Sequence, residues 1–298
     1  MAVRTQGELF EEIVTMQIVS YRVGDRETYG VVVDDSVVDL RKRLPPTHRT
    51  LRDVLTLNAL DEARSAAEGQ TGDHSLDEIT FLPVIPNPDK ILAVALNYDD
   101  HIAETGRDKT ANPAWFIRVA ASQVGHQQPV VMPKVSDNLD FECELAAIIG
   151  KGGHAIPAGE ALEHVAGYSC YLDGSVRDWQ RHTRQITAGK NFNSTGGFGP
   201  WMVTADEIQD PQVLDLSTRL NGRVMQHGNT KDMVFSVAEL IAYCSTWTTL
   251  EPGDVIVTGT PGGVGFKRTP PVFMQVGDVV EIIVENIGTL THRIEREL

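Results

Sequence analysis

The stretch DFECELAAIIG, residues 140–150, decides the fold class, because it is a nearly continuous apolar run that also carries Glu142 and Glu144. Side chains alternate between the two faces of a β-strand, so both glutamates are expected on one face and Cys143 on the other. Two like charges on a half-buried strand repel each other, and each is costly to remove from water without a compensating charge. No Lys or Arg stands among the adjacent residues. The pattern therefore raises the question of whether a metal ion supplies that charge.

The chain around this stretch consists of short apolar segments separated by turn residues. An Asn221–Gly222 pair between apolar flanks is a strong signal for a two-residue hairpin. Many short strands joined by Gly-rich turns favour a mixed, β-rich (α+β) fold with a rolled mixed β-sheet or β-barrel. Strands are expected at 90–96, 141–150, 164–173, 217–226, 254–259 and 278–294.

A segment with three prolines, FLPVIPNPDK at 81–90, places a domain boundary near residue 85. Before it, residues 16–40 alternate and are broken by turn signals, which predicts three antiparallel strands. Residues 50–69 have helical spacing and end at a glycine. Short helices are further expected at 100–105 and 236–248. The prediction is an N-terminal extension, a small N-terminal β domain and a larger catalytic domain, at 1–15, 16–85 and 86–298.

The charge balance excludes some classes of partner. A formal net charge of −15 over 298 residues leaves no basic stripe for nucleic acid or for an anionic membrane. The three cysteines show no CxxC spacing, which suits a reducing compartment. The N-terminus has no signal-peptide core, and no apolar run approaches the ~18 residues of a membrane helix. A cytoplasmic protein is expected.

Carboxylates and a histidine pair are the first candidates for chemistry. Glu142 and Glu144 are hard oxygen ligands, and Asp173 is the next carboxylate in an apolar context. Without thiolates or clustered histidines, such a set favours Mg²⁺ or Mn²⁺ over Zn²⁺. The alternative is that both glutamates face solvent on an amphipathic strand. His101 and Glu104 have the i,i+3 spacing of helix neighbours, so they form either a general base or a surface contact.

Two loops contribute further candidates. Lys190 follows a glycine in a polar loop and either contacts an anion or enolate or is merely solvated. The run VIVTGTPGGVG, residues 255–265, lacks the Gly-Lys-Ser/Thr ending of a phosphate loop, so it is interpreted as a substrate-side turn with Thr260 as a donor. No GxSxG motif is present, which argues against a serine α/β-hydrolase. Cys143 is expected in the core.

From Met16 onward, these segments and their order along the chain resemble the fumarylacetoacetate hydrolase family. The resemblance implies a rolled mixed β-structure, usually dimeric, preceded by a small N-terminal β domain, so a homodimer is expected. The segments that carry it are LNYDDHIAETG, DFECELAAIIGK, DGSVRDWQ, GKNF with GPWMVTADEI, LNGRVMQ, TLEPGDVIVTGTPGGVG and VGDVVEIIVENIGTL.

The resemblance also implies roles for single residues. Mg²⁺ or Mn²⁺ would be held by the two glutamates of an ExE motif and by a later aspartate, which would answer the opening question. A His–Glu dyad would lie on a lid that orders when substrate binds, next to an active-site lysine, a substrate-contacting glutamine and a threonine of the TGTP turn. These positions are Glu142, Glu144 and Asp173 for the metal, His101 and Glu104 for the dyad, and Lys190, Gln180 and Thr260 for the rest.

The chain departs from the family pattern at two places. Relatives often have NDVSARD where this chain has LDGSVRD, residues 172–178, which keeps the aspartate but loses its asparagine neighbour. Many relatives have a lysine where this chain has Arg118, in AWFIRVAAS. An arginine there favours a bidentate grip on a substrate carboxylate. Both departures bear on the substrate and leave the predicted metal ligands intact.

The leading hypothesis is a metal-dependent C–C bond hydrolase acting on a 1,3-dicarbonyl compound such as an acylpyruvate, in aromatic catabolism. His101, oriented by Glu104, would activate water, and Lys190 would stabilise the leaving enolate. The alternative keeps the metal and changes the reaction to a 2-oxo acid lyase or isomerase, of the oxaloacetate decarboxylase or hydratase type. A third class is a dimer that only binds a small carboxylate. The sequence specifies neither the substrate side chain nor the oligomer size.

Overall fold

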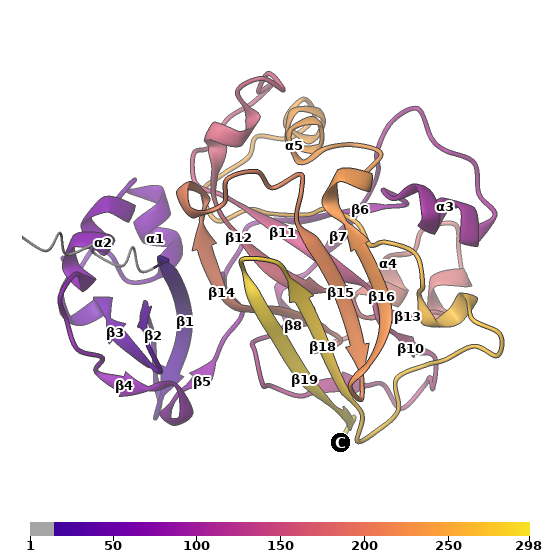
Figure 1. The fold of residues 1–298 in the computed structure, drawn as a ribbon, viewed down its shortest axis with the longest axis horizontal. Helices are drawn as coiled ribbons and strands as arrows, with labels where there is room; N and C mark the ends of the chain where they lie inside the picture. Colours follow the sequence, from indigo (N-terminus) through magenta and orange to yellow (C-terminus); the bar gives the residue numbers. More distant parts are fainter. Residues whose placement is uncertain (1–14) are drawn as a thin grey trace, which may run out of the picture.

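The computed structural model describes residues 15–298. The predicted extension, 1–15, lies outside the described residues except for its last residue. Within the described part no helix is long and apolar enough to cross a membrane. The fold is sheet-rich with few helices, as the strand pattern predicts (Figure 1).

The largest sheet has twelve strands. Along it the strands run in the order β4-β3-β2-β1-β14-β12-β11-β17-β6-β7, while β5 pairs with β1 and β8 with β14. The strands are β1 (Gln17–Val23), β2 (Arg26–Val33), β3 (Ser36–Asp39), β4 (His74–Ser75), β5 (Thr80–Phe81), β6 (Ile91–Ala95), β7 (Ala114–Arg118), β8 (Gln123–Val124), β11 (Cys143–Ile149), β12 (Val165–Leu172), β14 (Gly196–Thr204) and β17 (Val255–Val257).

Two smaller sheets complete the β-structure. A five-stranded sheet has the order β16-β15-β18-β19-β9, and a short pair joins β10 to β13. The pairs β17–β6, β14–β8 and β19–β9 are parallel and the others antiparallel, so the structure is mixed. The large sheet ends at β4 and β7 and stays open, so the rolled mixed sheet is observed and not a closed barrel. The remaining strands are β9 (Val130–Met132), β10 (Leu139–Asp140), β13 (Ser175–Val176), β15 (Asp215–Leu220), β16 (Arg223–Asn229), β18 (Val279–Val284) and β19 (Gly288–Arg296).

The helices are short and lie at the ends of strands. The α-helices are α1 (Leu51–Thr56), α2 (Leu60–Ala67), α3 (Asp99–Thr105), α4 (Thr187–Lys190) and α5 (Val237–Ser245). The 3₁₀-helices are η1 (Leu40–Lys42), η2 (Leu76–Glu78), η3 (Ala120–Ser122), η4 (Ala161–His164), η5 (Trp179–Arg181), η6 (Ala205–Glu207), η7 (Thr230–Asp232) and η8 (Gly265–Lys267).

The position of the central strand β11 explains why residues 140–150 are so apolar. Every residue of β11 is buried, because both of its faces are covered. Cys143 and Leu145 on one face belong to the core between the large sheet and the five-stranded sheet. Ala146 and Ile148 on the other face belong to a core that also contains residues of α1 and α2. The predicted alternation is confirmed, and a strand held on both faces is a rigid support for a site.

The N-terminal part is joined to the rest of the large sheet by the pairing of β1 with β14, and its helices share a core with β11. Strand β1 pairs with β14 at two registered positions, Gln17 with Val203 and Ile18 with Met202. Strands β1, β2 and β3 with α1 and α2 lie to one side of the molecule, in indigo and purple (Figure 1). The three predicted antiparallel strands are present. The predicted domain boundary near residue 85 lies between β5 and β6. It stays a prediction, because strands from both sides of it belong to the same sheet.

Local sequence features explain most element boundaries. Asn221 and Gly222 both have positive φ, 51° and 77°, and form the predicted two-residue hairpin between β15 and β16. The single helix predicted at 50–69 is wrong: it is split into α1 and α2 at Asn58, whose φ of 53° is incompatible with a continuing helix. Strand β14 was not predicted, because its glycines and proline obscure the alternation.

Candidate metal centre and active site

Three carboxylates meet at the centre of the large sheet. Glu142 lies just before β11, Glu144 lies within it, and Asp173 follows β12 directly. Each offers an oxygen atom, and these atoms lie within 4.8 Å of one another. All three side chains are buried. The antiparallel pairing of β11 with β12 places Cys143 opposite Leu172, which brings the start of one strand beside the end of the other.

Cations that are distant in sequence compensate Glu142. The ammonium group of Lys190, at the end of α4, lies 2.5 Å from Glu142 Oε2, and Arg177 Nη2 lies 2.7 Å from Glu142 Oε1. Burial acts to raise the pKa of Glu142, but the charges of Arg177 and Lys190 outweigh it, and the pKa is held well below the usual range. Glu142 is therefore ionised in the folded protein. Lys190 is buried and is not a solvated loop lysine.

Arg118 lies behind Asp173, and this corrects the expectation that it grips a substrate carboxylate. Its side chain is 1% exposed and does not line the cavity described below. The guanidinium forms an ion pair with Asp173 and donates hydrogen bonds to the Gly174 carbonyl at 3.1 Å and to Thr195 Oγ1 at 3.3 Å. Lys190 also pairs with Asp173. Arg118 thus holds an acidic residue of the site, and each of its three nitrogen atoms already donates to a protein group.

Glu144 has no such compensation within the described residues. Its carboxylate accepts one hydrogen bond, from the backbone N–H of Gly259 at 2.5 Å. Burial and the negative charges of Asp173 and Glu142 raise the pKa of Glu144 well above its ordinary value. Gly259 has a φ of 95°, and a Cβ there would lie 2.7 Å from Asn97 Cβ, so only glycine brings this N–H to the carboxylate. A buried carboxylate in this state lacks a cation.

The charge balance and the donor set fit a divalent cation. Four buried carboxylates, Asp140, Glu142, Glu144 and Asp173, face three buried cations, Arg118, Arg177 and Lys190. A divalent ion turns this net negative charge into a net positive one and supplies the missing partner of Glu144. Oxygen donors alone are the ligands of hard cations. Glu142, Glu144 and Asp173 are therefore the residues that could hold Mg²⁺ or Mn²⁺, and the buried cations supply part of the compensating charge that the opening question asks for.

His101 and Glu104 form the predicted pair on α3. His101 Nδ1 lies 2.7 Å from Glu104 Oε1, while Glu104 Oε2 accepts the backbone N–H of Gly263 at 2.9 Å. Because a carboxylate only accepts hydrogen bonds, Nδ1 carries a hydrogen, and in the neutral form of the imidazole the lone pair is on Nε2. His101 is buried, so the pair is not a surface contact. The imidazole is oriented as a base.

A cavity of about 270 Å³ connects these groups. Its floor, defined by Glu142, Glu144 and Lys190, is buried, and its mouth, defined by Arg107, Arg181 and Lys267, is exposed. The walls include His101, Gln180, Thr260, Phe116 and Phe266.

Thr260 and Gln180 each keep a hydrogen-bond donor for a ligand. Thr260 Oγ1 accepts from Gln226 Nε2 at 2.8 Å, which leaves its own hydrogen to donate. Gln180 Oε1 accepts from Arg177 Nη1 at 3.1 Å, which leaves its NH₂ group. The structure thus brings every predicted site residue to the cavity wall except Arg118, Glu104 and the metal-ligand candidate Asp173, which do not line it.

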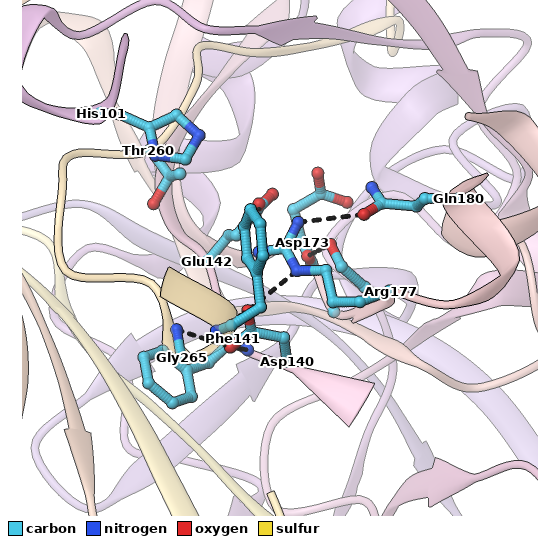
Figure 2. Close-up of polar contacts among 12 residues, drawn as sticks. His101, Asp140, Phe141, Glu142, Asp173, Arg177, Gln180, Thr260 and Gly265 are labelled. Atoms are coloured by element: carbon cyan, nitrogen blue, oxygen red, sulfur yellow. Dashed lines mark hydrogen bonds and ion pairs between the residues drawn. The ribbon is translucent and has the colours of Figure 1, made fainter. Parts of the chain in front are cut away.

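The sequence interpretation missed Asp140 and the role of Arg177. Arg177 Nε donates to Asp140 at 2.8 Å, whereas its sequence neighbour Asp178 accepts from Ser136. Figure 2 shows Arg177 between Gln180, Glu142 and Asp140. One signal was available: Asp140 opens the quoted stretch, two residues before Glu142.

Comparison with known proteins agrees with this geometry. Residues 90–295 match the fumarylacetoacetate (FAA) hydrolase C-terminal family. A human protein named oxaloacetate tautomerase FAHD2A, mitochondrial, is 40% identical over 262 residues, which cover 87% of this chain and 83% of that protein.

Solved structures agree over nearly the whole chain. A putative HpcE protein from Mycobacterium smegmatis superimposes with a TM-score of 0.85 at 34% identity, covering 95% of this chain and 100% of that one. Maleylpyruvate hydrolase from Sphingobium sp. SYK-6, in complex with manganese(II) and pyruvate, has a TM-score of 0.79 at 28% identity, with 95% and 100% coverage. The chain is therefore a metal-dependent enzyme of the fumarylacetoacetate hydrolase family.

Proposed function

We propose that the protein interconverts the enol and keto forms of a 2-oxo acid such as oxaloacetate. The observation that carries this proposal is the His101–Glu104 pair, whose basic Nε2 belongs to the same cavity as the acidic floor. Proton transfer between carbon and oxygen needs a positioned base and a stabilised enolate, and it needs no second substrate. The 40% identity to a protein named oxaloacetate tautomerase supports the choice.

The chain's own residues would divide the work as follows. His101 would take the hydroxyl proton of the enol at Nε2 and deliver a proton to C3, while Glu104 stabilises the imidazolium that forms. Lys190 and Thr260 would face the oxygen on which negative charge develops. Gln180 would orient the substrate through its free NH₂. When bound at Glu142, Glu144 and Asp173, the divalent cation supplies Lewis acidity at that oxygen.

Hydrolysis of an acylpyruvate is the second candidate. The same lone pair on His101 can deprotonate water, whose oxygen then bonds to the distal acyl carbon. The C–C bond breaks, and the pyruvate enolate takes up a proton at C3. The specific support is structural: a maleylpyruvate hydrolase shares the fold over 95% of this chain. Both candidates pass through a 2-oxo acid enolate.

Two assays on the Mn²⁺-loaded protein separate the candidates. The first follows decay of the enol absorbance of oxaloacetate above the uncatalysed rate, and the second follows pyruvate release from acetylpyruvate and fumarylpyruvate. We expect catalysed enol decay without pyruvate release. His101→Asn should lower kcat by a factor of about 10² to 10⁴ while Mn²⁺ binding, measured by calorimetry, stays unchanged.

The matched control is His227→Asn, because His227 is an exposed histidine on β16 that does not line the cavity. It should leave both assays unchanged. Pyruvate release from acylpyruvates would move the assignment to the hydrolases. Enol decay that persists in His101→Asn would refute the base, and no turnover in either assay would refute both candidates.

Assembly and location remain proposals. The chain is proposed to act as a homodimer on a small carboxylate or diketone, without nucleic acid or membrane partners. The cytoplasmic location stays a prediction, because the human relative is named mitochondrial. Light scattering of the purified protein measures the oligomeric state, and imaging of the tagged full chain measures the location in the cell.

A further inference from the structure

The three cations of the mouth have no carboxylate partner. Among residues 15–298, Arg107, Arg181 and Lys267 take part in no ion pair, whereas Arg177 and Lys190 deeper in the cavity are each paired with two carboxylates. What sets these three cations apart is that they line one cavity, in a chain with a net charge of −15. Unpaired cations that converge on a cavity attract anions and hold them there.

A single aromatic ring aligns two of these cations. Phe266 packs under Arg177, whose Cζ lies 4.3 Å from the ring centroid. Lys267 Nζ lies 5.3 Å and Arg181 Cζ 5.8 Å from the same centroid. Cation–π contacts of this kind restrict long side chains that would otherwise move freely in water. Arg177 is already paired with two carboxylates, so Arg181 and Lys267 are the cations next to this ring that can bind a ligand.

The loop that carries Phe266 and Lys267 is fixed to the floor of the cavity. Asp140 accepts the backbone N–H groups of Gly265 at 2.9 Å and Phe266 at 3.0 Å, and it also pairs with Arg177 (Figure 2). A Cβ at Gly265 would lie 1.9 Å from the Val272 carbonyl oxygen, so only glycine fits. Since Arg177 also binds Glu142, one buried network sets the spacing between floor and mouth.

The mouth loop also contacts the helix that carries the dyad. Lys267 Nζ donates to the Thr105 carbonyl at the end of α3, at 3.2 Å. A group bound by Lys267 would therefore lie beside the helix that positions His101. This arrangement suits a ligand that spans the cavity from the floor to the mouth.

We propose that Arg181 and Lys267 bind a second carboxylate, so that the substrates are dianionic 2-oxo acids. The 2-oxo acid end would lie at the floor and the distal carboxylate at the mouth. This inference rests on the proposed function for its 2-oxo acid end. Arg181 offers a fork of N–H donors that matches a carboxylate, and Lys267 adds a point charge. Neither residue touches the reacting atoms, and both set specificity.

The test measures binding to the Mn²⁺-loaded protein by calorimetry and requires no turnover. The probes are 2-oxoglutarate and 2-oxohexanoate, which have similar lengths and differ in the distal carboxylate. The wild type should bind 2-oxoglutarate at least about tenfold more tightly. The variant Arg181→Gln/Lys267→Met should lose most of this preference and keep its affinity for 2-oxohexanoate within about twofold.

The matched control is Arg223→Gln/Lys231→Met, which removes the same two charge types from exposed positions outside the cavity. It should keep the preference. Equal binding of the two probes by the wild type, or an equal loss in the control, would overturn the subsite.

Turnover of the same variants distinguishes this inference from the proposed function. Enol decay with an unchanged preference in Arg181→Gln/Lys267→Met would leave the proposed function standing and overturn the subsite. A lost preference in a protein without activity toward oxaloacetate or acylpyruvates would support the subsite and refute the reaction.

Discussion

The floor and the mouth of the cavity handle charge in opposite ways. At the floor, Arg118, Arg177 and Lys190 are buried, and every one is paired with carboxylates. At the mouth, Arg181 and Lys267 are exposed, and neither is paired within the described residues. Burial makes an unpaired charge expensive, while exposure makes it cheap. The protein therefore needs carboxylate partners for the buried cations near the floor in order to fold. The exposed cations at the mouth can stay unpaired until a ligand binds.

This difference implies different costs of substitution. Removing one partner of a buried pair leaves an uncompensated charge and destabilises the fold. Removing an exposed, unpaired cation changes stability little and changes the attraction of anions. Floor variants should appear in unfolding experiments, and mouth variants in the dependence of rate on substrate concentration.

The largest effect is expected from Arg118→Met, which preserves much of the side-chain volume and removes the charge beside Asp173. The free energy of unfolding should fall by about 3–5 kcal/mol, because a buried ion pair is broken on one side. Chemical denaturation of the metal-free protein measures this. Arg296→Met is the control, since Arg296 forms an exposed pair with Asp137, and it should change stability by less than about 1 kcal/mol.

The opposite result is informative for the same variant. A protein that unfolds like the wild type but has a raised KM would restore the original expectation that Arg118 binds substrate. It would also contradict the view that the buried cations near the floor need their carboxylate partners.

The second effect is the loss of stability of the fold in acid. Burial lowers the pKa of His292, and also of His126, to about 4. Below the unfolded value of about 6.5 the unfolded chain binds the proton and the folded chain does not, so stability is complete above pH 6.5 and falls toward pH 4. At pH 5 the loss from His292 should be about 2 kcal/mol.

The measurement is the free energy of unfolding between pH 7 and pH 5. His126→Asn should flatten the dependence, because it removes one of the two histidines whose pKa is lowered, while His227→Asn should not. If the slope is unchanged in His126→Asn, the acid sensitivity of the fold lies elsewhere.

The sequence predicted the floor better than the mouth, for a physical reason. Strand periodicity is a local property, so Glu142, Glu144 and the end of the next strand at Asp173 were found from short-range pattern and from the family resemblance. The cations that balance them come from residues 118, 177 and 190, and no local pattern states that these segments meet.

The fold shows the same limit. Hairpins such as Asn221–Gly222 were predicted because a turn type requires particular residues. The break between α1 and α2 at Asn58 and the long strand β14 were not predicted, because the periodicity of the sequence does not mark them. A single residue with positive φ interrupts the helical pattern, and glycines and a proline obscure the alternation of β14. Phe266 was missed for a related reason: its neighbours Arg177 and Arg181 are distant in sequence.

The smallest predicted effect is the salt dependence of substrate capture. Exposed charges are screened by salt, and buried pairs are screened far less. Raising the ionic strength from about 0.05 M to about 0.5 M should therefore raise KM for oxaloacetate roughly threefold to tenfold and leave kcat within about twofold. In Arg181→Gln/Lys267→Met the KM should already be high and should depend little on salt. A fall in kcat at constant KM would instead mean that salt acts on the floor, and the division between a matched floor and an unmatched mouth would fail.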